Sequence, residues 1–268
     1  MHQLFQSLTI VAPQWQPIFY SVGGLALLIF ALATWDRLSI WQQGRDEAGS
    51  PMAGLSIMGL LRLSFLKLFS PDCLLARRVF ARSRVRGLML LSIIWGAIIL
   101  LGGVLVSAVS FTFNWPIPGG QVGLVFSLLL DLGGGLLLAG LLTALGRRYL
   151  FRPERWVAVT ADGLLLTLFT LVVILGFVME GVRLAPLGWE GMSRWPVGTL
   201  FGLLLALLVG GRTAVLAAAY PGLYLLHAGL ALALMAYIPF SKLFHILAAQ
   251  IVTYAATREL EAGRSGIT

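Results

Sequence analysis

Two histidines in the last apolar stretch of the chain are the residues best placed to do chemistry. His227 and His245 are 18 residues apart, and the only other histidine is His2. If the stretch between them is mostly helical, a rise of 1.5 Å per residue separates them by roughly 27 Å, close to the thickness of a bilayer's hydrocarbon core. Eighteen residues also make five helical turns, so both rings would project from nearly the same side. The spacing predicts one helix that reaches two sites near opposite membrane faces.

The composition indicates where such a helix lies. Hydrophobic residues make up 59% of the chain and charged residues 11%, and the mean hydropathy is +0.91. These values lie outside the range of soluble globular proteins. The N-terminus lacks a basic region followed by a short apolar run and a small-residue cleavage site, so we expect no removable signal peptide. The sequence predicts an all-α integral membrane helical bundle, with residues 1–268 forming a single membrane domain.

Five apolar runs are long enough to span a bilayer. They cover residues 17–36, 87–111, 122–146, 157–179 and 219–240. Two further segments predict interfacial or re-entrant helices. Basic residues interrupt the first of these, 52–70, which is typical of an amphipathic helix lying at the membrane surface. The second, 196–211, has only 16 residues, and a sixth span there is the alternative.

The basic residues are distributed unevenly between the predicted spans. Segment 37–86 carries nine Lys and Arg residues and segment 147–155 carries four, whereas 112–121 carries none. The positive-inside rule therefore predicts an outside N-terminus and a cytoplasmic C-terminus. This orientation explains the formal net charge of +8 better than nucleic-acid binding does. The basic run at 77–86 could also hold anionic membrane lipids or dock an acidic soluble partner.

Most conventional active sites are excluded by the residues available. A single cysteine, Cys73, cannot hold an iron–sulfur cluster, which needs about four thiolates. The sequence also shows no nucleophile–base–orienter set and no phosphate-cradling motif. We therefore expect electron and proton transfer rather than self-contained enzyme catalysis, with any cluster carried by a partner.

Ionisable residues inside the predicted spans are the other functional candidates. An unpaired carboxylate within the membrane is costly, so Asp131 is a candidate for proton exchange with a quinone. The alternative is that Asp131 lies near the outer third of its span, where it is neutral or paired with a polar group. Asp162 is a second proton or quinone candidate, although pairing with Arg155 or Lys242 would also account for it. Glu180 and Arg183 are spaced i,i+3, which predicts a helix-end ion pair.

The histidine region resembles a known family. The segment PFSKLFH at 239–245, preceded by His227, is similar to the end of cytochrome b subunits typified by the respiratory nitrate reductase gamma subunit. Relatives of that subunit occur in heterodisulfide-reductase and sulfite-reduction-associated membrane complexes. Similar blocks follow the same order over about 70–258: Asp131 with a glycine-rich span, GRRYLFRPERW at 146–156, Asp162-Gly163, Gly176-Phe177 and Glu180-Gly181-Val182-Arg183.

The resemblance implies one or two b haems, with His227 and His245 as ligands to the haem iron. In the family each haem also takes a histidine from the second span. The matching segment here is Gly87-Leu88-Met89-Leu90, which has leucine at that position. The second ligand could then be the thioether of Met89, come from another subunit or be absent. Lys242 could meet a haem propionate or a quinone carbonyl, or reach the interface as a snorkelling side chain.

The second ligand position of the same span also carries leucine, Leu100. The histidines could therefore hydrogen-bond a quinone or a backbone carbonyl instead of iron. The resemblance predicts the membrane subunit of a quinone-linked respiratory oxidoreductase, which transfers electrons between quinol/quinone and a cytoplasmic iron–sulfur partner. The alternatives are a haem-free anchor of such a complex that contributes a quinone pocket, and a small transporter or lipid-handling protein.

Overall fold

The computed structural model of the chain describes residues 16–42, 74–113, 115, 120–151, 160–241 and 244, and this part is helical throughout. The predicted all-α fold is confirmed. The predicted helix at 52–70 lies outside the described residues. The longer elements are α2 (Gln16–Gln42), α6 (Arg84–Thr112), α7 (Gly120–Tyr149), α8 (Thr160–Leu184), α9 (Pro196–Leu208) and α10 (Thr213–Tyr237), and the shorter ones are α5 (Arg77–Phe80), η2 (Ala185–Ser193) and η3 (Ile238–Phe240).

Helix length and composition agree with a membrane bundle. Four stretches of the described residues are long and apolar enough to cross a bilayer: 84–107, 120–149, 163–193 and 213–240. Helix α2, with 27 residues, is a fifth long helix. Helix α9 has 13 residues, which corresponds to roughly 20 Å, less than the hydrocarbon thickness. The chain is therefore a multi-pass membrane protein with four to five long apolar helices and one short one.

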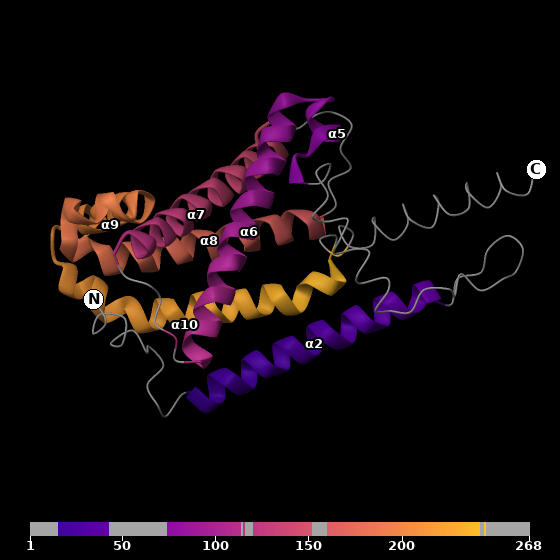
Figure 1. The fold of residues 1–268 in the computed structure, drawn as a ribbon, viewed down its shortest axis with the longest axis horizontal. Coiled ribbons are helices and arrows are strands. Elements are labelled where there is room, and N and C mark those ends of the chain that lie inside the picture. Colours follow the sequence, from indigo (N-terminus) through magenta and orange to yellow (C-terminus); the bar gives the residue numbers. More distant parts are fainter. Residues whose placement is uncertain are drawn as a thin grey trace, which may run out of the picture. The chain divides into compact units, whose positions relative to one another are not determined.

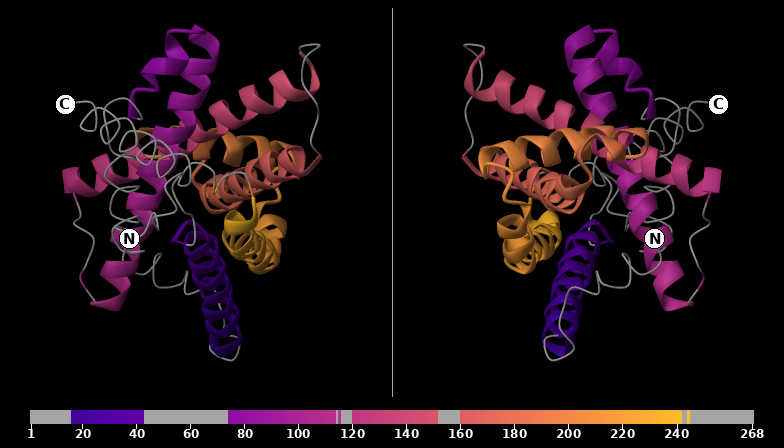
Figure 2. Two further views of the ribbon diagram at one scale, coloured as in Figure 1. Left: turned by 90° about the vertical axis from the view of Figure 1, so that its right-hand side faces the viewer. Right: turned by 90° about the vertical axis from the view of Figure 1, so that its left-hand side faces the viewer.

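The chain divides into two compact units, and one of them contains α5 to α9 and most of α10, up to Ala231. Within this unit α6 crosses α7 (Figures 1 and 2). Glycines let the two helices approach closely. A methyl group on Gly96 would lie 2.6 Å from Cβ of Leu137, and one on Gly133 would lie 2.5 Å from Cγ2 of Ile99. Small residues at such crossings are typical of helix packing in membranes.

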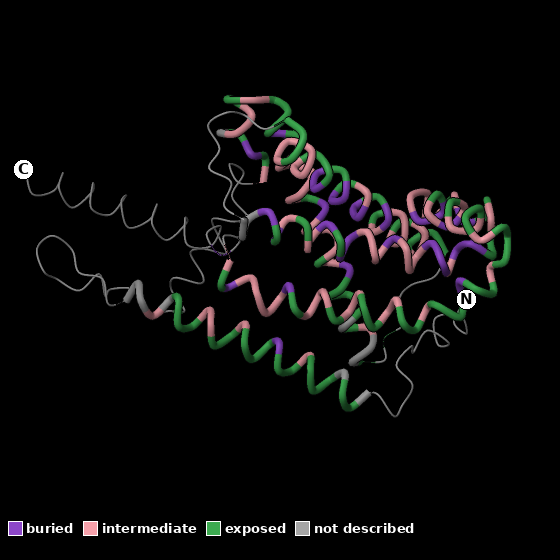
Figure 3. The backbone as a smooth tube through the Cα atoms, turned by 180° about the vertical axis from the view of Figure 1, so that it is seen from behind, coloured by how far each residue is buried: buried purple, intermediate pink, exposed green. Residues whose placement is uncertain are grey.

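The best-buried part of this unit lies between α7 and α8. Leu137, Leu138 and Leu141 of α7 pack against Val173 and Phe177 of α8. In Figure 3 the buried residues concentrate along α7 and α8, whereas α2 is mostly exposed. Exposed apolar side chains are the expected state of helices that face lipid.

Helix α9 folds back onto α8 after a tight reversal. The reversal is η2, in which Gly188 has φ 53°, a left-handed conformation that glycine adopts without a Cβ penalty. Two glycines then bring the helices together, because a methyl on Gly202 would lie 2.9 Å from the carbonyl oxygen of Gly181. The ring of Phe201 stacks on Phe177 with centroids 5.1 Å apart. The short helix is thus packed along its length against a long one (Figure 1).

The other compact unit includes α2 and the chain from Leu232 onward. Here α2 contacts η3. Pro239 and Phe244 are buried, and Ala26 is the buried residue of α2 among those with described side chains. The division between the units falls inside α10, which supplies residues to both.

Candidate functional site

His227 lies in α10 with its ring against α8. A methyl group on Gly176 would lie 3.4 Å from its Cε1, so the absence of a side chain there makes room for the imidazole. The Nδ1 atom is buried and has no hydrogen-bond partner among the described residues. A buried polar atom without a partner is costly, which makes this ring the most unusual polar group of α10.

The helix that carries His227 ends well before His245. Helix α10 stops at Tyr237, η3 covers Ile238–Phe240, and Ser241 is extended with ψ 170°. Pro239 lies inside η3 and lacks an N–H for a continuing helix. The stretch between the two histidines is therefore helical from His227 to Phe240, with a change of helix type at Ile238. Lys242 and His245 lie outside the described residues, so their predicted roles stay predictions.

The described residues include one of the two predicted histidine ligands. They supply one imidazole, and the positions on α6 that resemble ligand sites carry Leu90 and Leu100. The backbone oxygen of Met89 packs on α7, 3.0 Å from a methyl placed on Gly140. The His227 ring has the backbone of Val172 in α8 as a hydrogen-bonding partner, while its Nδ1 has no partner in the described part of the chain. No group of three metal-ligating side chains occurs there either.

Asp131 has a well-defined role in the structure. Its side chain is 3% exposed and lies in α7. Its Oδ2 accepts a hydrogen bond from the Val197 N–H at 2.8 Å, and its Oδ1 accepts one from the Gly198 N–H at 2.7 Å. Both donors belong to the first turn of α9, where backbone N–H groups have no partner within the helix. The carboxylate therefore caps α9 from a neighbouring helix.

Glu180 and Arg183 lie beside the same turn of α9. Arg183 Nη2 and Glu180 Oε1 are 3.4 Å apart, which agrees with the predicted i,i+3 pair. A methyl on Gly198 would lie 2.7 Å from Cγ and Cδ of Glu180, so this carboxylate rests against the backbone that Asp131 caps. The guanidinium of Arg183 also lies 5.7 Å from the ring centroid of Trp195, within cation–π range.

Two hydroxyl groups complete this polar region, which we call the α9 turn cluster: Asp131, Glu180, Arg183, Trp195, Thr199 and Tyr220. Thr199 is 1% exposed, and its Oγ1 has no hydrogen-bond partner among the described residues. Tyr220 of α10 packs against the core formed by Val182, Ala185 and Leu216, and Val182 directly precedes Arg183 in the chain. The cluster joins α7, α8, α9 and α10 at one place. Asp162, the other predicted proton candidate, lies in the first turn of α8, at the opposite end of that helix from Glu180.

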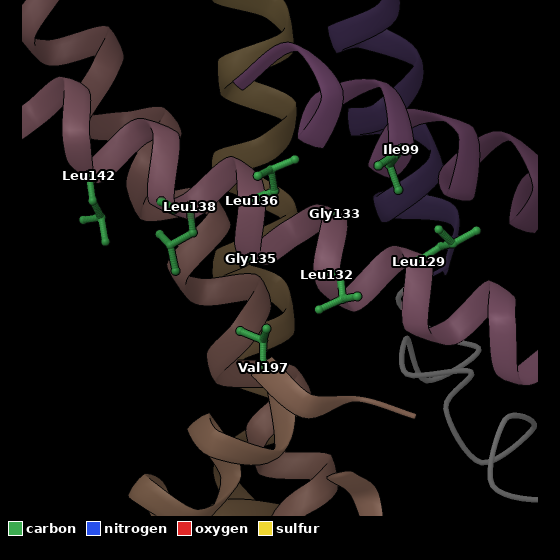
Figure 4. Close-up of a pocket in the computed structure, with 10 residues that line it drawn as sticks. Ile99, Leu129, Leu132, Gly133, Gly135, Leu136, Leu138, Leu142 and Val197 are labelled. Carbon is green, nitrogen blue, oxygen red and sulfur yellow. The ribbon is translucent and has the colours of Figure 1, made fainter. Parts of the chain in front are cut away.

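An apolar groove runs along α7 and passes Val197 in the first turn of α9, which lies against Gly135 near the middle of the groove (Figure 4). Its volume is about 560 Å³. Figure 4 shows leucines of α7 along it, with Ile99 of α6 and Val197 of α9 beside them. The lining residues are Ile99, Leu129, Leu132, Gly133, Gly135, Leu136, Leu138, Ala139, Leu142 and Val197. A groove of this lining would hold an apolar chain.

Sequence reasoning missed the turn of α9 as the partner of Asp131, although one local signal was present. Pro196 stands at the first position of the helix, and the residue before it, Trp195, makes no side-chain cap. Proline favours a helix start, and a start without Ser, Thr, Asp or Asn leaves its N–H groups unpaired. In an apolar environment such a helix needs an acceptor from elsewhere, and an intramembrane aspartate is the natural source.

Comparisons with known proteins agree with the resemblance seen in the sequence. A curated relative, the EtfAB:quinone oxidoreductase of Syntrophomonas wolfei subsp. wolfei, is 23% identical in an alignment of 251 residues that covers 87% of this chain and 32% of that protein. The chain thus spans about a third of the length of that relative. No solved structure matches the chain. The family model of the nitrate reductase gamma subunit matches residues 119–263, more than half of the sequence, so the chain belongs to the nitrate reductase gamma subunit family.

Proposed function

We propose that the chain is the membrane subunit of a quinone-linked respiratory oxidoreductase complex. In this role it passes electrons between a quinol/quinone pair and a cytoplasmic iron–sulfur partner. The observation that carries the proposal is the family match over 119–263, because that range includes Asp131, Glu180, His227 and His245. Proteins of this family are subunits of multi-subunit oxidoreductases. The relative from Syntrophomonas is named as a quinone oxidoreductase, which supports quinone as the small-molecule partner.

The proposed orientation has the N-terminus outside and the C-terminus in the cytoplasm of a bacterial or archaeal cell. The support is the clustering of basic residues, including Arg147 and Arg148 in the last turn of α7. In this orientation the α9 turn cluster lies toward the outer side, because α8 starts near the cytoplasmic face and Glu180 is in its last turns. Quinone chemistry at the cluster would then exchange protons with the outer compartment.

Quinone turnover tests the proposal directly. The full chain, purified from its native membrane with whatever subunits accompany it, is reduced through those subunits while reduction of a soluble quinone analogue is followed. We expect the complex to reduce the quinone analogue, and we expect this reduction to stop when the chain is removed by mild dissociation. Complexes that turn over without the chain, or a chain that never accompanies a redox partner, would contradict the proposal.

The haem content separates this function from its haem-free alternative. Members of the family typically bind haem b, yet the described residues supply only His227 and no second ligand for it. His245 lies outside the described residues, and the predicted content stays one or two haems per chain, which pyridine haemochrome analysis measures. A b-type difference spectrum that is lost in His227→Ala and kept in Leu226→Ala would identify a haem at this histidine.

A folded, partner-bound preparation without a b-type spectrum would instead favour the alternative. The chain would then anchor its partner and contribute a quinone pocket without carrying electrons itself. The specific observation behind this alternative is that Leu90 and Leu100 occupy the resembling ligand positions of α6. The same preparation and the same quinone assay serve both possibilities.

A further inference from the structure

The groove along α7 and the α9 turn cluster share one helical turn. Val197 lines the groove, and its backbone N–H binds Asp131. The next residue, Gly198, contacts Glu180. The lining residues of α7 run from Leu129 to Leu142, a length of roughly 20 Å along the helix. The groove and the α9 turn cluster thus meet at two consecutive residues, Val197 and Gly198.

This combination matches one class of ligand. A membrane quinone has a flat ring with two carbonyl acceptors and a long isoprenoid tail. The groove is lined by apolar residues alone, which suits the tail. Arg183 offers N–H donors, Trp195 an aromatic surface and Thr199 a buried hydroxyl with no partner among the described residues. Such a mixture of an apolar pocket and a few convergent polar groups is characteristic of small-molecule sites.

We propose that the groove on α7 holds the isoprenoid tail of a quinone and that the α9 turn cluster holds its head group. This inference rests on the proposed function and assigns its quinone site. Glu180 is the proton-exchanging group, since its side chain is 21% exposed while Asp131, at 3%, has both oxygens engaged by α9. Asp131 is a positioning residue that holds the turn in place.

Reduction of the quinone to quinol takes two electrons, supplied by the iron–sulfur partner of the proposed function, and two protons. Glu180 in its protonated form gives one proton to a quinone oxygen, takes a replacement from water and gives that second proton to the other oxygen, after which water protonates it again. Quinol oxidation runs through the same groups in reverse, with Glu180 accepting the proton.

Photolabelling of the purified full chain in nanodiscs tests the location. The probe is an azido-quinone with an isoprenoid tail, and labelled peptides are mapped by mass spectrometry. We expect labels on residues 129–142 or on the first turn of α9, suppressed at least fivefold by excess unlabelled quinone and not by phosphatidylglycerol. Ala139→Phe fills the groove and should reduce labelling at least fivefold. Ala31→Phe, an exposed alanine of α2, is the matched control and should leave it unchanged.

The outcomes separate the inference from the proposed function. Labels that quinone suppresses but that map elsewhere and survive Ala139→Phe overturn the site while the function stands. Labels suppressed by phosphatidylglycerol identify a lipid groove, and labels replaced by contacts to a second copy identify a dimer face; both overturn the site. A wild-type chain that shows no quinone-suppressible label contradicts the proposed function itself.

A second readout tests Glu180. In the intact complex, Glu180→Gln should keep photolabelling within about twofold of wild type and slow quinone reduction at least tenfold, because the amide cannot carry the proton. Glu190→Gln removes an exposed carboxylate of η2 and should not change the rate. An unchanged rate in Glu180→Gln would remove Glu180 from the mechanism.

Discussion

Helix α7 makes two contacts of different kinds, one with α6 and one with α9. Against α6 it uses glycines and apolar side chains, such as Gly133 beneath Ile99. Against α9 it uses the Asp131 carboxylate and two backbone N–H groups. Lipid tails are as apolar as leucine, so the first contact gains from close packing and the second from hydrogen bonds that lipid cannot replace. The stability of the α6–α7 contact should therefore depend on the size of the side chains, and that of the α7–α9 contact on the hydrogen-bonding groups.

The largest effect is expected from removing the carboxylate without changing its size. Asp131→Leu leaves the N–H groups of Val197 and Gly198 without acceptors in an apolar environment, at a cost of about 2–4 kcal/mol of unfolding free energy. Asp131→Asn keeps one acceptor oxygen and should recover part of the loss. Equilibrium unfolding in mild detergent measures both. Equal stability of Asp131→Leu and wild type would show that the cap is not needed.

An intermediate effect is expected at the glycine crossing. Gly96→Ala places a methyl 2.6 Å from both Cβ and the backbone nitrogen of Leu137, so the helices must separate, at about 1–3 kcal/mol. Gly102→Ala is the matched control on the same helix, because no atom of the described residues lies within 4 Å of its added methyl. It should be neutral or stabilising by up to about 1 kcal/mol, since alanine favours helix over glycine.

Similar losses of unfolding free energy in the two alanine variants would mean that the close approach of α6 and α7 does not control stability. The test uses the same unfolding assay, and circular dichroism checks that both variants remain helical. A larger loss of stability in Gly102→Ala than in Gly96→Ala would show that the contact at Gly96 is not the one that controls stability.

The smallest effect on stability is expected from the ion pair. Arg183 and Glu180 are 3.4 Å apart and about a quarter exposed, and such pairs contribute only about 0.2–1 kcal/mol. Arg183→Gln should therefore unfold almost like wild type while weakening quinone photolabelling at least threefold. A stability loss as large as that of Asp131→Leu would make Arg183 a structural residue instead.

Much of the architecture could be predicted because it depends on local patterns. The long apolar runs of α6, α7 and α8 predict spans from composition and length alone, and the shortness of 196–211 predicts an element that differs from them. The Glu180–Arg183 pair follows from i,i+3 spacing on one helix. The resemblance at 239–245 was equally local, because it rests on consecutive residues.

Predictions are less complete where a residue's partner lies far away in the sequence. Asp131 was recognised as a candidate from its cost in lipid, but its partners are 66 and 67 residues away. Pro239 in the sequence indicates a break in the helix after His227, and the structure shows its form: α10 ends at Tyr237 and η3 follows. Neither the orientation of His227 toward Gly176 nor the groove beside Val197 has a sequence signal.

By itself, then, the sequence determined that this is an all-helical membrane protein of the nitrate reductase gamma subunit family, because apolar length, charge placement and short motifs are read along the chain. Only the tertiary structure decided that Asp131 caps α9, that Glu180 lies against the same turn, and that the groove on α7 passes Val197 of that turn. The physical reason is that hydropathy acts residue by residue, whereas the pairing of buried polar groups depends on which helices fold side by side.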